Sequence, residues 1–374
     1  MNEVSNAVLI DEPRTTTNSL VDEDDLIQRF LKDVGARGLV GEEDNAATAF
    51  LCATSARLQN PLNLTVSGES SAGKNFLLSK VADFIPAEHK RFITGMTPKA
   101  LMHASENEFQ HKAVFIAEYE GVAKADYAIR TMQSEKLIQW DYVDTAKGIK
   151  KKSRTVKGPA AFLQATTRPV LHRENETRLL FINVDESPEQ TAAILRRQAE
   201  TAQKGPLPDD EQTIKNWHDY MKELQTMNVS IPYAEELATH FPNGRVRSRR
   251  DFPKLLGMIE TLALMHQHKR QKENGAVLAA PEDYLIARRL FESSYATGPD
   301  NKLTELLLAA ESLQAKGDFR ISDLMGRTGW GKSKVYLVIA RAEELGCIAE
   351  TETRGIYRFL RSCAVPPLEL PDSI

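Results

Sequence analysis

The amino-acid sequence predicts an α/β fold of the P-loop class, in which a parallel sheet flanked by helices is followed by a helical module and a small C-terminal unit. Three observations support this prediction. Short apolar segments alternate with helical stretches through the first half of the chain, as they do in parallel sheets. A glycine-rich loop joins the first of these segments to a helix. The last part of the chain reads as two helices followed by two short strands.

The composition is that of a globular protein with room for two or three domains, with 374 residues, 41% hydrophobic and 27% charged. The formal net charge of -4 gives no overall attraction to nucleic acid, so any such contact must come from local basic clusters. No apolar run approaches the roughly 20 residues that cross a bilayer, and the N-terminus lacks the order of a signal peptide. We therefore expect a cytoplasmic protein without a membrane partner.

The sequence pattern divides the chain into five parts. Residues 1–21 are polar with little apolar periodicity and are expected to form a disordered tail. The α/β core with its N-terminal helices is expected over 22–186, and an all-helical lid over 187–295. A compact unit over 300–362 precedes a proline-containing tail over 363–374. The strands of the core are expected at 62–66, 91–94, 113–117, 160–165 and 179–184.

The most specific motif is a phosphate-binding loop between the first expected strand and a helix with apolar residues at Phe76, Leu77 and Val81. Glycines allow backbone amides to point inward around phosphates, and the helix N-terminus adds its dipole. Lys74 follows the second glycine and can reach the β and γ phosphates. A chance glycine-rich turn would lack this strand-loop-helix context. The predicted nucleotide-binding residues are Gly68, Glu69, Ser70, Ser71, Ala72, Gly73, Lys74 and Asn75.

One residue of this loop departs from the usual motif. Asn75 stands where a Ser or Thr hydroxyl ordinarily binds magnesium. Its amide oxygen is a candidate Mg2+ ligand, because carbonyl-type oxygens suit this ion, but it lacks the hydroxyl. The departure therefore bears on the rate of hydrolysis rather than on nucleotide binding.

Two further apolar strands end in polar residues. Glu118 and Glu120 follow the apolar run HKAVFIA, where a carboxylate can orient and polarise an attacking water or hold magnesium through a bridging water. The sequence does not decide between these two glutamates, and both could be solvated residues that merely follow a core strand. The strand AAFLQATT ends in Thr166 and Thr167, whose hydroxyls suit sensing of the γ phosphate or positioning of water. Either threonine could equally cap its strand.

Between these two strands, LIQWDYVDTAKGIKKKSRTVKGPAAF reads as a β-hairpin with its tip around Gly148. The tip and second segment carry cations with no intervening acid. These charges repel one another, which favours contact with a polyanion such as the DNA backbone. Such contacts are independent of base sequence and sensitive to salt, and the alternative is a solvated basic loop. The cations are Lys147, Lys150, Lys151, Lys152, Arg154 and Lys157.

The C-terminal unit has the pattern of a winged helix-turn-helix, with two helical faces around a glycine-containing turn. Its second helix begins with Lys332, Ser333 and Lys334, which places cations and a hydroxyl where a recognition helix meets phosphates or base edges. We expect these residues to contact DNA, although winged helices also serve as protein-protein modules.

In this order, the motifs resemble the AAA+ ATPases of the pre-sensor-1 hairpin helicase group. The likeness is to minichromosome-maintenance-like self-loading helicases and to primase-associated ATPases of phages and mobile genetic elements. It covers about residues 40 to 362, and the phrases TGMTPKAL, NVDESPEQT and RRDFPKLL also carry it. The resemblance implies an AAA+ core with a helical lid, ATP and Mg2+ as cofactors, and a homo-oligomeric ring, commonly a hexamer, that encircles DNA and hydrolyses ATP between its subunits.

The resemblance also implies roles for individual residues. Glu118 stands at the place of the catalytic Glu and is a candidate Mg2+ ligand, whereas Ala117 replaces the magnesium-binding Asp. Arg178 matches by spacing the arginine that one subunit inserts into the ATP site of its neighbour. Arg173 is the alternative, as is a surface arginine paired with a nearby glutamate. Arg250 is the expected second sensor of the lid, placed over the phosphates, unless it belongs to a patch that faces nucleic acid or solvent.

Three functions are consistent with these residues. The first hypothesis is an ATP-dependent DNA translocase or helicase in the replication of a phage or mobile genetic element. The second is an ATP-controlled DNA-binding regulator or loader with weak or absent hydrolysis, which Ala117 and Asn75 favour. The third is a degenerate ATPase that serves only as a ring subunit. Members of this group can carry a zinc-binding primase-type segment that the chain does not show, so priming would require a primase or polymerase partner.

Overall fold

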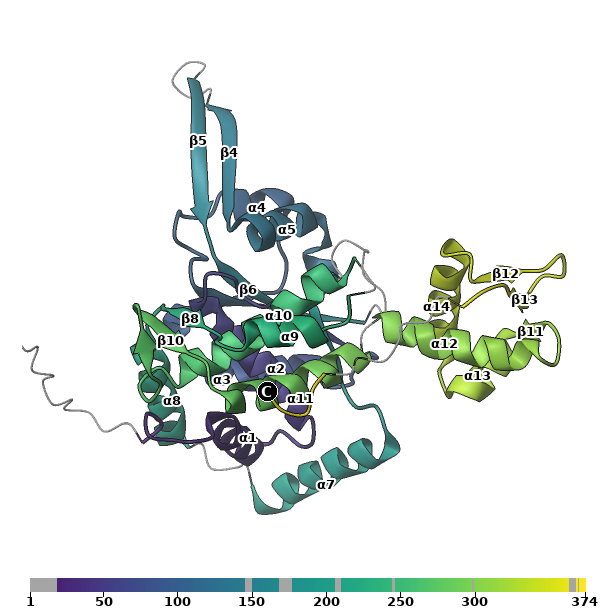
Figure 1. Ribbon diagram of the computed structural model, residues 1–374, viewed down its shortest axis with the longest axis horizontal. Helices are drawn as coiled ribbons and strands as arrows, with labels where there is room; N and C mark the ends of the chain where they lie inside the picture. The colour runs from purple at the N-terminus through teal and green to yellow at the C-terminus, as the bar shows by residue number, and fades with distance from the viewer. Residues whose placement is uncertain are drawn as a thin grey trace, which may run out of the picture.

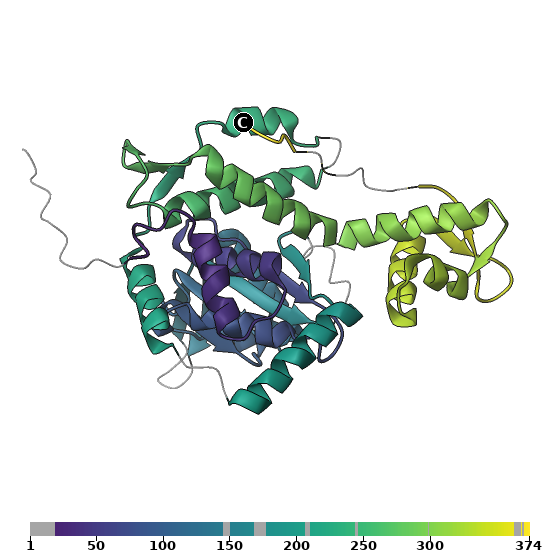
Figure 2. The same ribbon diagram turned by 90° about the horizontal axis from the view of Figure 1, so that it is seen from below.

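The computed structural model describes residues 19–144, 150–167, 177–205, 210–243, 246–297, 299–362, 368 and 370–374 (Figure 1). Within these ranges an α/β core carries a projecting hairpin, and a mostly helical module packs beside that core. A C-terminal unit extends from one end of the molecule in both views (Figures 1 and 2).

The core is built on a five-stranded parallel sheet in the order β2-β3-β6-β1-β7. Its strands are β1 (Leu64–Ser67), β2 (Lys90–Ile93), β3 (Lys112–Ile116), β6 (Ala160–Thr166) and β7 (Leu180–Asn183). Every residue of β1 and β6 is buried, as expected of strands that helices cover on both faces. The five strands expected from the sequence are present. Their carboxyl ends meet at one edge of the sheet, here called the carboxyl edge, and their first residues form the amino edge.

Helices cover both faces of this sheet. Successive side chains of a strand point to opposite faces, so Ala113 and Phe115 of β3 join one hydrophobic cluster while Val114 and Ile116 join the other. The apolar run of β3 therefore has a packing partner on each side. The covering helices of the core are α1 (Leu26–Ala36), α2 (Glu43–Thr54), α3 (Lys74–Asp83), α4 (Pro98–Met102) and α5 (Asp126–Glu135).

A two-stranded antiparallel hairpin projects from the core (Figure 1). It consists of β4 (Leu137–Asp144) and β5 (Lys150–Lys157). The chain enters it after α5 and leaves it directly into β6, so the hairpin is inserted between β3 and β6. The register pairs Trp140 with Arg154 and Tyr142 with Lys152. An expected basic hairpin is thus present, and β6 anchors it to the central sheet.

A mostly helical module follows the sheet and shares its core. Trp217 is fully buried, and its ring centroid lies 6.2 Å from that of Phe30 and 5.4 Å from that of Phe50. Burial of such a ring contributes roughly 3 kcal/mol, which fixes the module against α1 and α2. Three short strands also form a small sheet there, so the expectation of an all-helical module is wrong. Strands of two or three residues are too short to show an alternating pattern. The elements are α7 (Pro188–Lys204), α8 (Glu211–Glu223), β8 (Asn228–Ser230), α9 (Ala234–His240), α10 (Ser248–Met265), β9 (Lys272–Glu273), β10 (Ala276–Leu278) and α11 (Pro281–Thr297).

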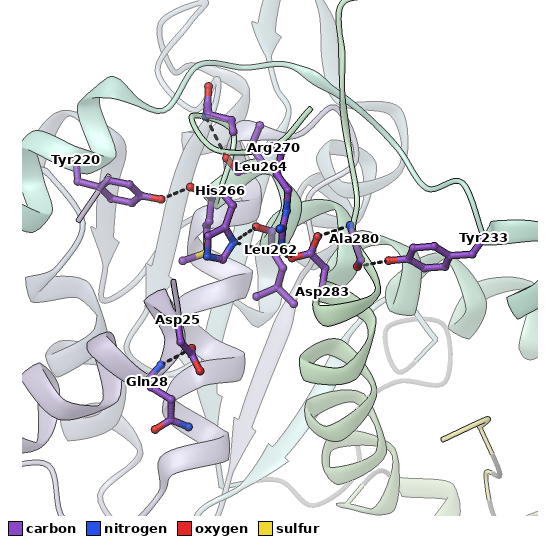
Figure 3. Close-up of polar contacts among 12 residues, drawn as sticks. Asp25, Gln28, Tyr220, Tyr233, Leu262, Leu264, His266, Arg270, Ala280 and Asp283 are labelled. Atoms are coloured by element: carbon purple, nitrogen blue, oxygen red, sulfur yellow. Dashed lines mark hydrogen bonds and ion pairs between the residues drawn. The ribbon is translucent and has the colours of Figure 1, made fainter. Parts of the chain in front are cut away.

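A buried polar network joins the end of α10 to the start of α11 (Figure 3). Arg270 Nη2 lies 2.6 Å from Asp283 Oδ1, and the other carboxylate oxygen accepts from the amide of Ala280 at 2.8 Å. The Tyr233 hydroxyl donates to the carbonyl of Ala280 at 2.8 Å, and His266 Nδ1 lies 3.0 Å from the carbonyl of Leu262. Burial lowers the pKa of His266, which keeps the ring neutral. These polar groups bond mainly to backbone and to one another, as expected of a structural network rather than a binding site.

The C-terminal unit has a hydrophobic core of its own, which includes Leu306 of its first helix and Leu324, Val338 and Tyr357. Its three strands pair antiparallel in the order β11-β13-β12. Gly329 ends one helix with φ 69°, a conformation that favours glycine and allows the sharp turn into the next. The elements are α12 (Pro299–Gln314), β11 (Phe319–Arg320), α13 (Ile321–Thr328), α14 (Lys332–Glu344), β12 (Ile348–Glu350) and β13 (Ile356–Phe359).

Both expected tails are shorter in the described residues than the sequence suggested. Leu20 is fully buried in the main core, because it packs with the N-terminal helices. At the other end, Leu370 is 6% exposed, and the Tyr284 hydroxyl donates to the carbonyl of Pro371 at 2.6 Å. Arg288 Nη1 lies 2.7 Å from Asp372 Oδ1. The end of the chain therefore returns from the C-terminal unit and docks on α11.

Candidate nucleotide-binding site

The phosphate loop joins the carboxyl end of β1 to α3. Two of its residues have left-handed backbone, Ser71 with φ 68° and Gly73 with φ 94°. Such turns between right-handed residues direct successive amides into one concavity that binds anions. Gly73 is also the N-cap of α3, and no side chain caps that helix. The first amides of α3 are therefore not covered by a capping side chain, and the helix dipole adds positive potential at the same place.

Gly68, the first residue of the loop, is a glycine for a different reason. A Cβ at this position would lie 2.4 Å from Val184 Cγ2 and 3.0 Å from Glu186 Oε1. Real Cβ atoms do not approach other atoms so closely, so a side chain here would push away the segment that follows β7. Gly68 is therefore favoured by the close approach of Val184 and Glu186, and Gly73 by its left-handed backbone conformation.

Lys74 is the first residue of α3 and is only 8% exposed. Its ammonium group donates to the carbonyls of Gly68 at 2.9 Å and Glu69 at 2.5 Å. Burial lowers the pKa of Lys74, while the negative charges of nearby glutamates, among them Glu118 and Glu120, oppose that shift. The charged amine thus lies inside the loop, where phosphate oxygens could replace the two carbonyls as acceptors.

The polar ends of β3 and β6 lie at the same edge as the loop. Thr166, the last residue of β6, pairs with Ser67 at the end of β1. The Thr166 hydroxyl donates to Glu120 Oε1 at 3.3 Å, and Thr166 is 1% exposed. Glu118 and Thr167 are exposed at this edge. The structure therefore brings together the loop, both glutamates and both threonines that the sequence singled out.

Oxygen donors at this edge fit a magnesium ion bound together with phosphates. Asn75 is exposed on the first turn of α3, and the carboxylate of Glu118 interacts electrostatically with Lys74. Carboxylate and amide oxygens suit Mg2+, which commonly takes only one or two protein ligands beside phosphate oxygens and water. Ala117 supplies no side-chain oxygen, and no group of three or more His, Cys, Asp or Glu in the described ranges could hold a metal alone.

Three residues at the carboxyl edge were missed from the sequence. Glu186 Oε1 accepts from the amide of Glu69 at 2.5 Å. Asn183, the last residue of β7, accepts from the Ser67 hydroxyl and from Lys302 Nζ, the latter at 2.9 Å. Asn183 and Glu186 follow an apolar strand just as Glu118 does, and that signal could have found them. Lys302 could not be found in this way, because it comes from the distant helix α12.

Arg178, expected to serve the ATP site of a neighbouring subunit, and Arg250, expected in the lid, both lie at the amino edge. Arg178 Nε donates to Ser134 Oγ at 3.1 Å, just before β7 begins at Leu180. Arg250 Nη1 donates to Thr177 Oγ1 beside it. A four-residue strand, about 13 Å long, separates this edge from the phosphate loop. The expected position of Arg250 over the phosphates of its own chain is therefore not the one observed, because the start of α10 bonds to Thr177 and Leu179, just before β7. Arg173 lies outside the described residues.

A buried ion pair fixes α10 to this amino edge. Lys254 is 8% exposed, and its ammonium group donates to the carbonyl of Leu179 and to Asp251 Oδ1, both at 2.9 Å. Arg247 Nε donates to the other carboxylate oxygen of Asp251 at 2.9 Å. Burial lowers the pKa of Lys254, and the adjacent Asp251 carboxylate opposes the shift. The segment before β7 and the start of α10 are thus held together.

The hairpin cations have more partners than the sequence suggested. Lys151 Nζ lies 2.8 Å from Asp141 Oδ2, and Lys157 Nζ lies 2.7 Å from Glu106 Oε1. Arg154 Nη1 donates to the carbonyl of His103 at 3.2 Å. No acid intervenes between these cations in the sequence, but other segments supply carboxylates that pair with two of them. Lys152 lies on β5 opposite Tyr142, whereas Lys147 and the side chain of Lys150 lie outside the described residues.

The first turn of α14 faces two environments. Lys332 and Ser333 are exposed. Lys334 is half-buried, with its Nζ 4.4 Å from the ring centroid of Trp330. Burial lowers the pKa of Lys334, and the negative charges of Glu305, Glu186 and Glu69 oppose the shift. Lys334 thus lies within electrostatic range of Glu305 in its own unit and of two acids near the phosphate loop, which was not expected of a DNA-contacting residue.

No helix in the part of the chain that the structure describes is both long enough and apolar enough to span a lipid bilayer.

Comparison with known proteins agrees with the geometry of the loop. The chain is 21% identical over 233 residues to a protein of Methanothermobacter marburgensis named "Uncharacterized protein MTBMA_p00010". The alignment covers 60% of this chain but only 28% of that relative, so the chain spans less than a third of its length. A family model described as the MTBMA_p00010 P-loop domain matches residues 12–223, which include the phosphate loop, both glutamates and the hairpin. The chain therefore belongs to the MTBMA_p00010 P-loop domain family.

Proposed function

We propose that the protein is an ATP-dependent DNA translocase or helicase of the AAA+ type, acting in the replication of a phage or mobile genetic element. The observation that carries the proposal is the place of the β4-β5 hairpin. It is inserted between β3, which leads to Glu118, and β6, which ends in Thr166. The hairpin joins the amino end of β6, so a change at the γ phosphate that shifts β6 as a whole would also move the hairpin.

At the carboxyl edge, each residue has a distinct task in the proposed reaction. The loop amides and Lys74 bind the β and γ phosphates, and Asn75 and Glu118 are the residues that would hold Mg2+. When bound, the ion neutralises the charge that develops on the phosphate oxygens. Glu118 orients the attacking water, and the bond from Thr166 to Glu120 keeps the neighbouring carboxylate in place.

The proposal includes a ring, because the arginines of the amino edge lie too far from the loop of their own chain. In a head-to-tail assembly the amino edge of one subunit would face the carboxyl edge of the next. Arg178 and Arg250 would then stabilise the charge of the transition state from across the interface. The fixed position of α10 beside the segment that precedes β7 supports such a role, because a preorganised cation needs no rearrangement during the reaction.

The proposed partner of the hairpin is single-stranded DNA in the channel of the ring. Cations that contact phosphates bind without regard to base sequence, which suits a motor that moves along the strand. In this proposal α12–α14 and β11–β13 form a winged helix-turn-helix unit that contacts duplex DNA through Lys332 and Ser333. A primase or polymerase is a further proposed partner.

A second function, an ATP-controlled DNA-binding regulator or loader, is favoured by specific residues. Ala117 lacks the carboxylate of an efficient magnesium site, and Asn75 lacks the usual hydroxyl. Two hairpin cations are paired with Asp141 and Glu106, which weakens the electrostatic case for a polyanion. In this function, ATP would control assembly and hydrolysis would be slow.

The experiment that separates the two functions is ATP turnover by the full chain with and without single-stranded DNA. We expect turnover that DNA stimulates several-fold. A variant with Lys150, Lys151 and Lys152 changed to Ala should keep basal turnover and lose the stimulation, with a weaker salt dependence of DNA binding. A matched control changes the exposed Lys204, Lys215 and Lys316 to Ala, which removes the same charge away from the hairpin.

The outcomes discriminate clearly. Stimulation that is lost in the hairpin variant and kept in the control supports the motor. Tight ATP binding without turnover, with or without DNA, contradicts the motor and supports the regulator. Equal stimulation of the hairpin variant and the wild type would remove the hairpin from the DNA-binding surface.

A further inference from the structure

The carboxylate of Glu186 lies in the phosphate loop itself. Its Oε1 accepts from the amide of Glu69 at 2.5 Å, and a Cβ on Gly68 would lie 3.0 Å from the same oxygen. Glu186 also interacts electrostatically with Lys74, and its effect on that lysine is larger than that of Glu118 or Glu120. A carboxylate oxygen thus bonds to a loop amide and lies near the lysine, the groups that a bound phosphate would use.

The neighbours of Glu186 direct it toward the loop. The amide of Asp185 donates to Glu42 Oε1 at 2.6 Å, and Asp185 Oδ1 accepts from the amide of Ser187 at 2.8 Å. Ser187 is the N-cap of α7, where its hydroxyl accepts from the amide of Gln190. These bonds fix the backbone on both sides of Glu186. Its position in the loop therefore follows from the turn between β7 and α7.

A phosphate and this carboxylate cannot share the loop. Both are anions, and like charges at hydrogen-bond distance repel one another. A phosphate in the loop would also compete with Glu186 for the loop amides and for Lys74. Binding of a nucleotide therefore requires Glu186 to leave. Lys302 and Lys334 of the C-terminal unit also interact electrostatically with Glu186. A displaced carboxylate would thus move toward these cations.

We infer that Glu186 is a built-in competitor of the nucleotide: its carboxylate occupies the phosphate loop of the nucleotide-free chain and lowers the affinity for ATP. The inference rests on the proposed binding of ATP at this loop, but not on DNA or on hydrolysis.

The test is the Kd of MgATP for the full chain, measured by isothermal titration calorimetry without DNA. Glu186→Gln keeps the size of the side chain but removes its charge, and Glu186→Ala removes the competitor altogether. We expect both variants to bind MgATP about tenfold more tightly, a change equivalent to about 1.4 kcal/mol. The matched control is Glu189→Gln, which removes the same charge from an exposed position on the first turn of α7. It should leave the Kd unchanged.

An equal or weaker affinity of both Glu186 variants, with normal urea unfolding, would overturn the inference and make Glu186 a support for the shape of the loop. Tightening by Glu189→Gln to the same extent would also overturn it, because the effect would then be one of general charge. This failure is distinct from that of the proposed function. The proposed motor function is contradicted if the wild-type chain binds MgATP but does not hydrolyse it, and the affinity of Glu186→Gln has no bearing on that result.

Discussion

The two edges of the central sheet differ in what they offer to a nucleotide. At the carboxyl edge, the loop amides, Lys74, Glu118 and Thr166 converge within one chain. At the amino edge, Arg178 and Arg250 lie side by side on Ser134 and Thr177, about 13 Å away across the length of a strand. The first edge can bind a nucleotide, and the second carries the charges that could complete the site.

In a parallel sheet, the role open to a residue thus depends on which end of a strand it occupies. Parallel strands gather all polar residues that follow them at one edge and all residues that precede them at the other. Arg178 precedes β7, so it cannot serve the loop of its own chain without dismantling the sheet. In the proposed mechanism its charge serves a second copy of the chain, so assembly is part of that mechanism.

The largest effect should come from removing the amino-edge cation. Arg178→Ala is expected to lower ATP turnover about 10³-fold, because an arginine supplied across an interface stabilises transition-state charge. The Kd for MgATP should stay within about twofold, because the loop that binds the phosphates is untouched. Steady-state turnover and calorimetry measure the two quantities. Arg358→Ala is the control, since that arginine bonds to Asp318 in the C-terminal unit.

Mixing two inactive variants sharpens this prediction. Lys74→Ala should lose nucleotide binding, and Arg178→Ala should lose turnover. Randomly mixed rings of the two should regain about a quarter of the interfaces, since each such interface combines an intact loop with an intact arginine. Mixtures that stay inactive would mean that the two edges do not meet between copies.

A smaller effect is expected from the two glutamates of the carboxyl edge. Glu118 is exposed and acts more strongly on Lys74 than Glu120 does, whereas Glu120 is held by Thr166 at 3.3 Å. Glu118→Gln should therefore lower turnover at least about 100-fold as the loss of a general base, and Glu120→Gln about tenfold as the loss of a support. Single-turnover rates at saturating MgATP measure both. The reverse order would assign the water to Glu120.

The sequence was most informative where a few adjacent residues determine the structure. The phosphate loop was found because the two glycines, the lysine and the following helix are contiguous, and the family match agrees. Strands β1, β3, β6 and β7 were found because they are mostly buried and therefore largely apolar, whereas β2 lies at the edge of the sheet and is half-buried or exposed. The hairpin was found from two β segments around a basic tip. Each of these features depends on local conformation and burial.

Features that depend on long-range packing could not be predicted in the same way. Arg250 belongs to the amino edge because Lys254 ties α10 to the carbonyl of Leu179. The electrostatic interaction of Lys334 with Glu186 depends on the position of α12, whose Lys302 bonds to Asn183 at the end of β7. The pairing of Lys151 with Asp141 depends on the register of the hairpin. No pattern within a single segment encodes these contacts.

The smallest predicted effect distinguishes the two edges by their response to acid. At the amino edge, Arg57 Nη2 lies 2.7 Å from His89 Nδ1. Burial and the charge of Arg57 lower the pKa of His89 from 6.5 to about 4. At the carboxyl edge, burial and the charge of Lys334 lower the pKa of Lys302 from 10.5 to about 8. A lowered folded-state pKa means that the unfolded chain binds the proton first, so stability is lost as pH falls between the two values.

The contribution of His89 to folding stability should therefore be complete above pH 6.5 and be lost as the pH falls to about 4. Lys302 should cause no change in stability between these two pH values, because both of its pKa values, 10.5 and about 8, lie above them. The loss should be about 1 kcal/mol, because water screens a half-exposed ring. Urea unfolding of the wild type and His89→Gln at pH 7.0 and 4.5 measures it, and the difference between the two proteins should shrink by that amount. If the two lose stability in parallel, the acid response arises from other groups, and His89 does not set the amino edge apart.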